Sequence, residues 1–156
     1  MIHNNLDAAL EAAGVTSSAH GTLNRQAKAA AKSAYQGMLQ RFFNHLITSM
    51  QTPSVIESIT GDLDAGHAAV VQIVSTGEAL QERRLAEIPA DEWQDVSVDI
   101  TPRDGVLSYL QHSFPVQLYE PFTTSDGNLS SRPVHDENGV PVLNREAVRR
   151  RDAMIE

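Results

Sequence analysis

A chain of 156 residues is long enough for one ordinary domain, and its 41% of hydrophobic residues fits a folded protein with a modest core. The absence of cysteine excludes disulfides, a thiol nucleophile and a cysteine-based zinc site. No apolar run approaches the roughly 20 residues of a membrane-spanning helix, and the first residues carry no secretory signal, so we expect a cytoplasmic protein without a membrane partner.

The net charge of −8 is unevenly distributed along the chain. Residues 1–50 carry four Lys or Arg against two carboxylates, whereas residues 51–100 carry ten carboxylates against two arginines. A surface this acidic repels a polyphosphate over most of its area. We therefore expect the isolated chain to bind nucleic acid weakly or not at all.

The first part of the chain has a helical pattern. Residues 6–13 predict a short helix that ends at Gly14. A long helix is predicted for about residues 22–50, with Thr22 as its cap and with apolar residues at spacings of three and four. The residue before a proline disfavours helical geometry, so the sequence around Pro53 predicts the end of this helix.

A second helix is predicted from about residue 53 to residue 65, closed by Gly66. In the long helix predicted for about residues 22–50, three basic residues share one face of the first half. That pattern is typical of a solvated face and is also compatible with a face that contacts phosphate. These residues are Arg25, Lys28 and Lys32.

The pattern changes at residues 68–74, a nearly continuous apolar and β-branched run that predicts a short strand buried on both faces. The next residues, Ser75–Glu78, have the spacing of a capping box and predict the start of a helix. Backbone N–H groups at such a turn can bind an anion, although simple capping accounts for the same residues. The candidate anion-binding residues are Ser75, Thr76 and Gly77.

The last third of the chain predicts two helices separated by strands and turns. Thr101 is predicted to cap a helix over about residues 102–113. After it, Asp126-Gly127 and Asn138-Gly139 are turn dipeptides, which indicate a hairpin of residues 129–135 with residues 140–143. Asn144 is predicted to cap a final helix that reaches the last residue.

Motifs for catalysis are missing from the sequence. It contains neither G-x-x-x-x-G-K-[ST] nor an Asp-Glu box after an apolar strand, and it lacks the serine-hydrolase pattern G-x-S-x-G. No two histidines have the i, i+4 spacing of a helical metal site. We therefore assign no catalytic residue and no metal ligand, and we expect no ATP hydrolysis by the isolated chain.

One phrase of the sequence resembles a known family. Val70–Ala79 reads VVQIVSTGEA and resembles the start of the second RecA-like lobe in strawberry-notch-type superfamily 2 helicases. Phrases in the same order on both sides extend the resemblance over nearly the whole chain, and the last two resemble the bacterial and phage branch. They are Gln40–Phe43, Gly105–Pro115, Phe114–Phe122 and Asn128–Pro133.

The resemblance implies an ATP-driven motor of two RecA-like lobes that acts on nucleic acid, in bacteria often joined to a methyltransferase domain. ATP and magnesium would bind parts of the parent protein outside this chain, which itself would hold no cofactor. The turn after the first strand of the lobe would face the nucleic-acid backbone, which nominates Ser75, Thr76 and Gly77. The surroundings of Arg149–Arg151 do not match the arginine-finger motif, so that role is not assigned to them.

The expected fold is α/β and mostly helical, with one short buried strand and a small C-terminal β-hairpin, as a partial RecA-like lobe plus an insertion. The expected parts are a helical linker region over 1–66, the start of the lobe over 67–114 and a family-specific insertion over 115–156. The first functional hypothesis is a non-catalytic helicase segment that contributes backbone contacts or interdomain packing to the rest of the polypeptide. The alternative is a stand-alone helical interaction module, a homodimer formed through the Tyr35–Met50 face.

Overall fold

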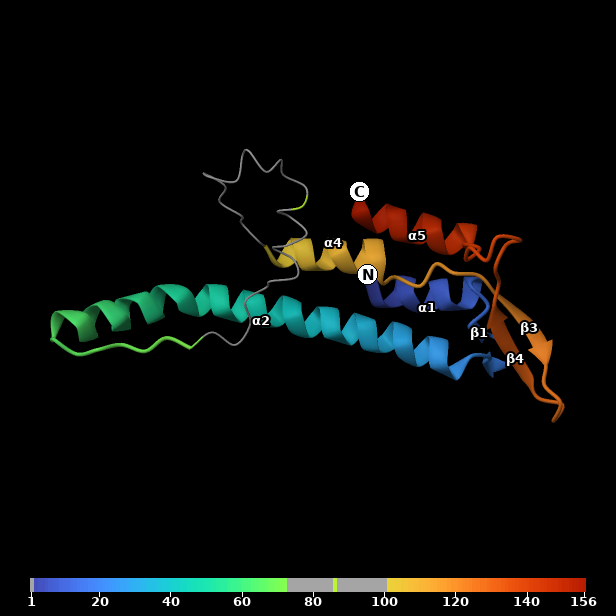
Figure 1. Ribbon diagram of the computed structural model, residues 1–156, viewed down its shortest axis with the longest axis horizontal. Helices are drawn as coiled ribbons and strands as arrows, with labels where there is room; N and C mark the ends of the chain where they lie inside the picture. The colour runs from blue at the N-terminus through green and yellow to red at the C-terminus, as the bar shows by residue number, and fades with distance from the viewer. Residues whose placement is uncertain (1, 73–85, 87–100) are drawn as a thin grey trace. The chain divides into compact units, whose positions relative to one another are not determined.

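The computed structural model describes residues 2–72, 86 and 101–156 (Figure 1). They form a mostly helical α/β fold with two small antiparallel sheets. The chain divides into two compact units: the first unit is Met1–Met38 with Leu107–Glu156, and the second unit is Leu39–Val106. The helices are α1 (Ile2–Ala12), α2 (Arg25–Asp64), α4 (Pro102–His112) and α5 (Arg145–Ile155), and the strands are β1 (Thr16–Ser17), β2 (Gly21–Thr22), β3 (Tyr119–Thr123) and β4 (Leu129–Pro133).

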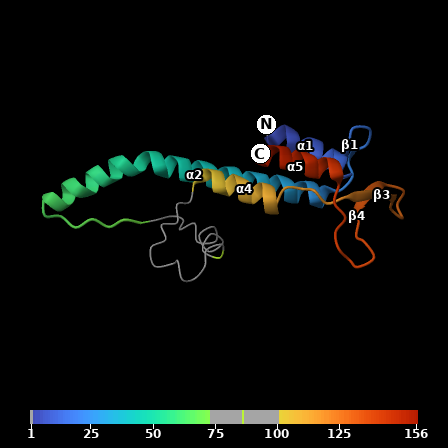
Figure 2. The ribbon, with the colours of Figure 1, turned by 90° about the horizontal axis from the view of Figure 1, so that it is seen from above.

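The first unit contains a buried apolar core. In it α1 and α5 lie side by side (Figures 1 and 2), and the small buried residues Ala9 and Ala147 leave room for a close approach of the two helices. The ring of Tyr109 lies 6.1 Å from that of Tyr35 and 6.2 Å from that of Phe114. The largest fully buried side chains are Leu6, Leu10, Val15, Met38 and Leu110.

Helix α1 stops before Gly14, as the sequence predicts, although it begins at Ile2 and not at residue 6. The N–H of Gly14 donates to the carbonyl of Glu11 and that of Val15 to the carbonyl of Leu10, and the φ of Gly14 is +80°. This is the Schellman arrangement, in which glycine adopts the left-handed conformation at no steric cost. A Cβ at this position would also overlap the carbonyl oxygen of Tyr119, so both the φ angle and the packing require glycine.

Two asparagines begin helices and bind distant segments at the same time. The Oδ1 of Asn144 accepts from the N–H of Ala147 at 3.0 Å, which confirms the predicted cap of α5, and its Nδ2 donates to the carbonyl of Ala12 at 2.9 Å. Asn24 has the same double role at the start of α2, toward Ala27 and Ser131. The prediction that Thr22 caps α2 is therefore wrong, because Thr22 pairs with Thr16 in the β1–β2 hairpin.

The C-terminal strands pair differently from the prediction. Strand β4 pairs with β3 through the Asp126-Gly127 turn, in the register Tyr119↔Pro133 and Thr123↔Leu129, and not with residues 140–143. The predicted Asn138-Gly139 turn is present, and residues 134–136 pair with residues 140–142 across it. The N–H of Val142 donates to the carbonyl of Val134, that of Asp136 donates to Val140, and His135 bridges to Pro141, so the predicted hairpin is formed next to its turn but does not include β4. Proline has no N–H to donate, which limits the ladder at this turn.

In the second unit, α2 continues through Pro53 to Asp64, so the predicted break between two helices is wrong. Pro53 cannot donate to the carbonyl of Ser49, but this part of the helix is exposed and water can satisfy that oxygen. The predicted stop at Gly66 is confirmed. Its φ is +80° and its N–H donates to Leu63, while that of His67 donates to Asp62.

The predicted buried strand is not formed over residues 68–72. Val70 is 96% exposed and Val71 is 61% exposed, and no strand lies against them in the part of the chain that the structure describes. Residues 73 and 74 lie outside the described residues. The apolar run shows that burial of these side chains would be favourable in free energy. It does not show which element could bury them.

Helix α4 begins as predicted, at the Thr101-Pro102 pair. The carboxylate of Asp104 accepts from the N–H of Thr101 at 2.9 Å and from its hydroxyl at 2.7 Å. Both bonds run from Thr101 to the Asp104 carboxylate and hold it over the first turn, where a negative charge is favourable at the helix N-terminus.

Candidate nucleic-acid interface

The three basic residues predicted to share a face of α2 do so in the structure. Arg25, Lys28 and Lys32 line one open surface pocket together with His20 and Thr22. All of them belong to the first unit. We call these five residues the basic pocket.

The β1–β2 hairpin supplies one side of the basic pocket, and the first turns of α2 supply the other. Thr22 is held in the hairpin opposite Thr16, and its Oγ1 accepts a hydrogen bond of 2.8 Å from the Nζ of Lys28. This contact leaves two N–H groups of the Lys28 ammonium for a ligand. Arg25 and Lys32 are exposed, and Lys28 is half-buried.

No carboxylate neutralises this pocket within the described part of the chain. The sequence has no Asp or Glu between Glu11 and Glu57, and no described carboxylate forms an ion pair with Arg25, Lys28 or Lys32. The first turn of α2 contains no acidic residue, so the positive end of the helix dipole adds to the same potential. The pocket is therefore a local positive site in a protein whose net charge is −8.

The spacing of the basic residues suits an extended chain of anions. A helix rises about 1.5 Å per residue, so about 10 Å separates Arg25 from Lys32 along the axis. A nucleic-acid strand in a duplex places one phosphate about every 3.4 Å along its axis. Three cations over this distance can therefore contact successive phosphates of one strand.

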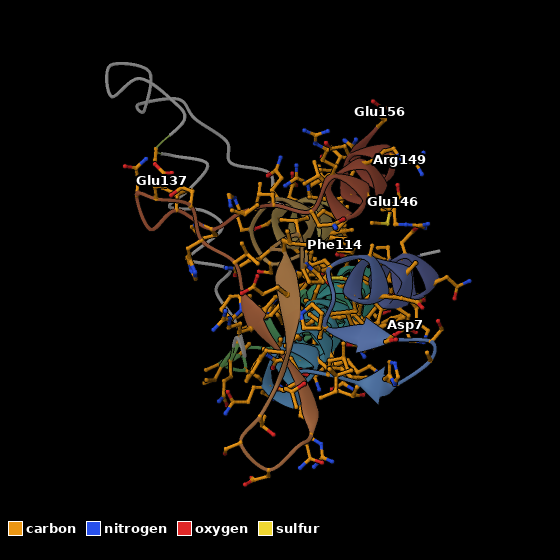
Figure 3. The ribbon with its side chains drawn as sticks, turned by 90° about the vertical axis from the view of Figure 1, so that its right-hand side faces the viewer. Asp7, Phe114, Glu137, Glu146, Arg149 and Glu156 are labelled. Carbon is orange, nitrogen blue, oxygen red and sulfur yellow. The ribbon has the colours of Figure 1, made fainter. Side chains whose placement is uncertain are left out.

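A second group of basic residues, on α5, is neutralised within the helix. Glu146 forms ion pairs of 2.9 Å with both Arg149 and Arg150, and Arg151 lies 2.7 Å from Asp152. Figure 3 shows Glu146 and Arg149 close together on α5. The hydrogen bonds from Arg149 lower the pKa of Glu146 below its ordinary value. These arginines already bind carboxylates within α5.

The other predicted anion-binding residues, Ser75, Thr76 and Gly77, lie outside the described residues, and their role stays a prediction. Within the residues that the structure does describe, no three or more His, Asp or Glu residues are grouped so that they could hold a metal ion. None of the described helices combines the length and the apolar character needed to cross a membrane.

Sequence reasoning found the helical part of the basic pocket and missed the hairpin part. Nothing in the sequence predicts the hairpin, because two-residue strands such as β1 and β2 leave no periodic signal. The contact between Lys28 and Thr22 follows only from the folded hairpin.

Comparisons with known proteins found no match to a family model, to a curated protein or to a solved structure. The resemblance to helicases thus depends on the short phrases of the sequence alone. The basic pocket is an independent observation, because its residues lie outside those phrases.

Proposed function

We propose that this chain is a non-catalytic segment of an ATP-dependent, strawberry-notch-like helicase and that it contacts the phosphate backbone of nucleic acid. The single observation that best supports the proposal is the basic pocket. It gathers Arg25, Lys28 and Lys32 on one face without a carboxylate among the described residues to neutralise them. Helicases bind the backbone more than the bases, and a row of cations suits that task.

In this proposal the parent protein supplies the catalytic parts. ATP and magnesium bind the missing lobe, and the chain contributes backbone contacts and interdomain packing. Ser75, Thr76 and Gly77 provide a second backbone contact, an assignment that follows from the family resemblance. The same resemblance supports the division into a linker region, the start of a RecA-like lobe and an insertion.

The proposal is tested by the binding of fluorescent oligonucleotides, single-stranded and duplex, over a range of salt concentrations. The triple variant Arg25→Gln, Lys28→Gln, Lys32→Gln removes three phosphate contacts. We expect about a 100-fold loss of affinity at low salt. The slope of log K against log salt should be less negative by about 2 for the single strand and about 3 for the duplex, because each contact releases counterions.

The matched control is the variant Arg149→Gln, Arg150→Gln, Arg151→Gln, which removes the same number of charges from α5. Because these arginines already pair with Glu146 and Asp152, we expect a change of less than about threefold in affinity. Equal losses in the two triple variants would show a non-specific charge effect and would overturn the assignment of the pocket.

A second measurement tests the segment assignment itself. We expect the purified chain to hydrolyse no ATP, with or without nucleic acid, since the sequence lacks a phosphate-binding loop. Turnover that co-purifies with the chain and disappears on mutation of its own residues would overturn the assignment.

A further inference from the structure

Helix α2 carries a seam of residues at alternating spacings of four and three, the heptad spacing of a coiled coil. Every residue of this seam is exposed except Leu39, which is half-buried. Phe43 is 51% exposed and Met50 is 73% exposed, so the apolar centre of the seam is uncovered. The seam residues are Arg25, Ala29, Lys32, Gln36, Leu39, Phe43, Leu46, Met50, Pro53, Glu57, Thr60 and Asp64.

The seam is arranged symmetrically about its midpoint, which lies between Asn44 and His45. Its basic residues occupy the first half, its acidic residues the second, and its large apolar residues the centre. Reversal of the order about the midpoint places opposite charges and similar apolar groups against each other. The resulting pairs are Arg25 with Asp64, Lys32 with Glu57, Leu39 with Met50, and Phe43 with Leu46.

We propose that α2 pairs with α2 of a second copy of this chain, antiparallel, about a two-fold axis between Asn44 and His45. In this register each Lys32 meets the Glu57 of the other copy, and the four apolar seam residues of each helix meet at the centre. A two-fold dimer repeats each contact, so every favourable pair occurs twice.

A parallel pairing would be unfavourable for the same seam. It would place Lys32 against Lys32 and Glu57 against Glu57, with like charges facing each other. It would also align the two helix dipoles, whereas antiparallel helices place opposite ends together. Charge complementarity thus selects both the orientation and the register.

The geometry of a long helix permits this contact. A 40-residue helix is about 60 Å long, and a repeat of 3.5 residues keeps a seam in contact when the two helices supercoil to the left. The apolar centre is short, so it buries little area. The charged pairs on either side are exposed to solvent, and exposed ion pairs contribute little affinity. We therefore expect a reversible dimer with a dissociation constant in the micromolar range, weakened by salt.

The dimer does not depend on the proposed function, but the two share residues. Arg25 and Lys32 cannot face the acidic end of a second helix and a phosphate backbone at the same time. An oligonucleotide should therefore shift the full chain from dimer to monomer.

The test is sedimentation of the full chain over a range of concentrations, with charge variants of one pair. Lys32→Glu and Glu57→Lys each replace two attractive contacts per dimer with two repulsive ones, and we expect each to raise the dimer dissociation constant about 10-fold. The double variant Lys32→Glu, Glu57→Lys restores the attraction with its sign reversed. We expect it to return to within about threefold of the original value.

The antiparallel orientation of the two α2 helices is tested separately by disulfide cross-linking. The chain has no cysteine of its own, so only the introduced cysteines can form a disulfide. A mixture of Leu39→Cys chains with Met50→Cys chains should form a disulfide-linked dimer under mild oxidation, and neither variant alone should do so. A parallel dimer would give the reverse result, with each variant linking to itself.

Three outcomes would overturn the proposal. They are a monomer at every concentration up to about 1 mM, a double charge variant as weak as the single ones, and cross-linking of either cysteine variant to itself. All three are measured without oligonucleotide, whereas the proposed function is tested by oligonucleotide binding. A chain that dimerises but binds no oligonucleotide, or the reverse, therefore distinguishes the failure of one proposal from the failure of the other. Circular dichroism of each variant checks that α2 is intact.

Discussion

The two units use their apolar residues in opposite ways. In the first unit, residues from both ends of the chain form a closed core, with Leu6, Leu10 and Leu110 at most 1% exposed. In the second unit, none of the described residues is buried, and side chains as large as Phe43 and Met50 face solvent. One helix, α2, extends through both environments.

This difference indicates what stabilises each part of α2. Residues Ala31 and Met38 are buried in the first unit, so burial contributes directly to the stability of that part. Beyond Leu39 the helix depends on local terms, which are the propensities of its residues and the glycine stop at Gly66. Isolated helices are marginally stable, so a helix with an exposed apolar seam gains stability from a partner.

The largest expected effect comes from the same truncation made in the two units. Leu110→Ala removes a buried side chain of the first unit and should lower the free energy of unfolding by about 3 to 4 kcal/mol. Met50→Ala removes an exposed side chain and should change it by less than about 0.5 kcal/mol in dilute, monomeric protein. Urea unfolding followed by circular dichroism gives both values, and equal losses would contradict the contrast between the units.

A smaller effect is expected from glycines that end helices in the two units. Gly14 and Gly66 both have a φ of +80°, so alanine costs about 1 kcal/mol of backbone strain at either position. Only at Gly14 would the new Cβ overlap a neighbour, the carbonyl oxygen of Tyr119; nothing lies within 4 Å at Gly66. We expect Gly14→Ala to cost about 3 kcal/mol and Gly66→Ala about 1 kcal/mol.

Thermal unfolding of the two glycine variants measures the cost of the overlap at Gly14. Both variants carry the same backbone strain, so the difference between their melting temperatures reports the overlap alone. Equal shifts in the melting temperature would show that the segment around Tyr119 moves aside at little cost. That result would mean the first unit is less closely packed than the buried fractions indicate.

The features predicted correctly from the sequence are those that depend on adjacent residues. The stops at Gly14 and Gly66 and the cap at Asn144 each follow from the conformation or side chain of one residue beside its own helix. The basic face of α2 follows from helical spacing in the same way. Local physics decides these features, so local patterns reveal them.

The wrong predictions concern choices between competing partners. Asn24, and not Thr22, caps α2. Thr22 is held in a hairpin, whereas Asn24 also donates a hydrogen bond to the carbonyl of Ser131. Strand β4 pairs with β3, while residues 134–136 pair with residues 140–142 across the predicted turn, so the prediction is wrong for β4 alone. Distant contacts decide such competitions, and a single sequence does not display them.

Pro53 and the run at residues 68–72 show the limits of local rules. A proline inside a helix costs about 3 kcal/mol, which suggested a break, but the helical residues on both sides favour one continuous helix. The apolar run suggested a buried strand, yet a strand needs a neighbour, and none is present in the described part of the chain.

The smallest predicted effect tests whether water is excluded from the core of the first unit, with the hydroxyl of Tyr109 as the probe. This side chain is 3% exposed, its hydroxyl has no hydrogen-bond partner in the described part of the chain, and burial raises its pKa to about 12, with a smaller contribution from Tyr35. Between about pH 10 and pH 12 the unfolded chain loses this proton while the folded chain keeps it. Folding stability therefore falls as the pH rises, by about 2 kcal/mol over that range.

Tyr109→Phe removes both the titration and an unpaired buried hydroxyl. We expect the variant to be as stable as the original at pH 7, or more stable by up to about 1 kcal/mol, and to lose less stability between pH 10 and pH 12. Urea unfolding at each pH measures the difference between the two proteins, which cancels the titration of the other tyrosines. An identical pH dependence would mean that water reaches the Tyr109 hydroxyl, and the contrast between a closed first unit and an exposed second unit would then hold for aliphatic side chains only.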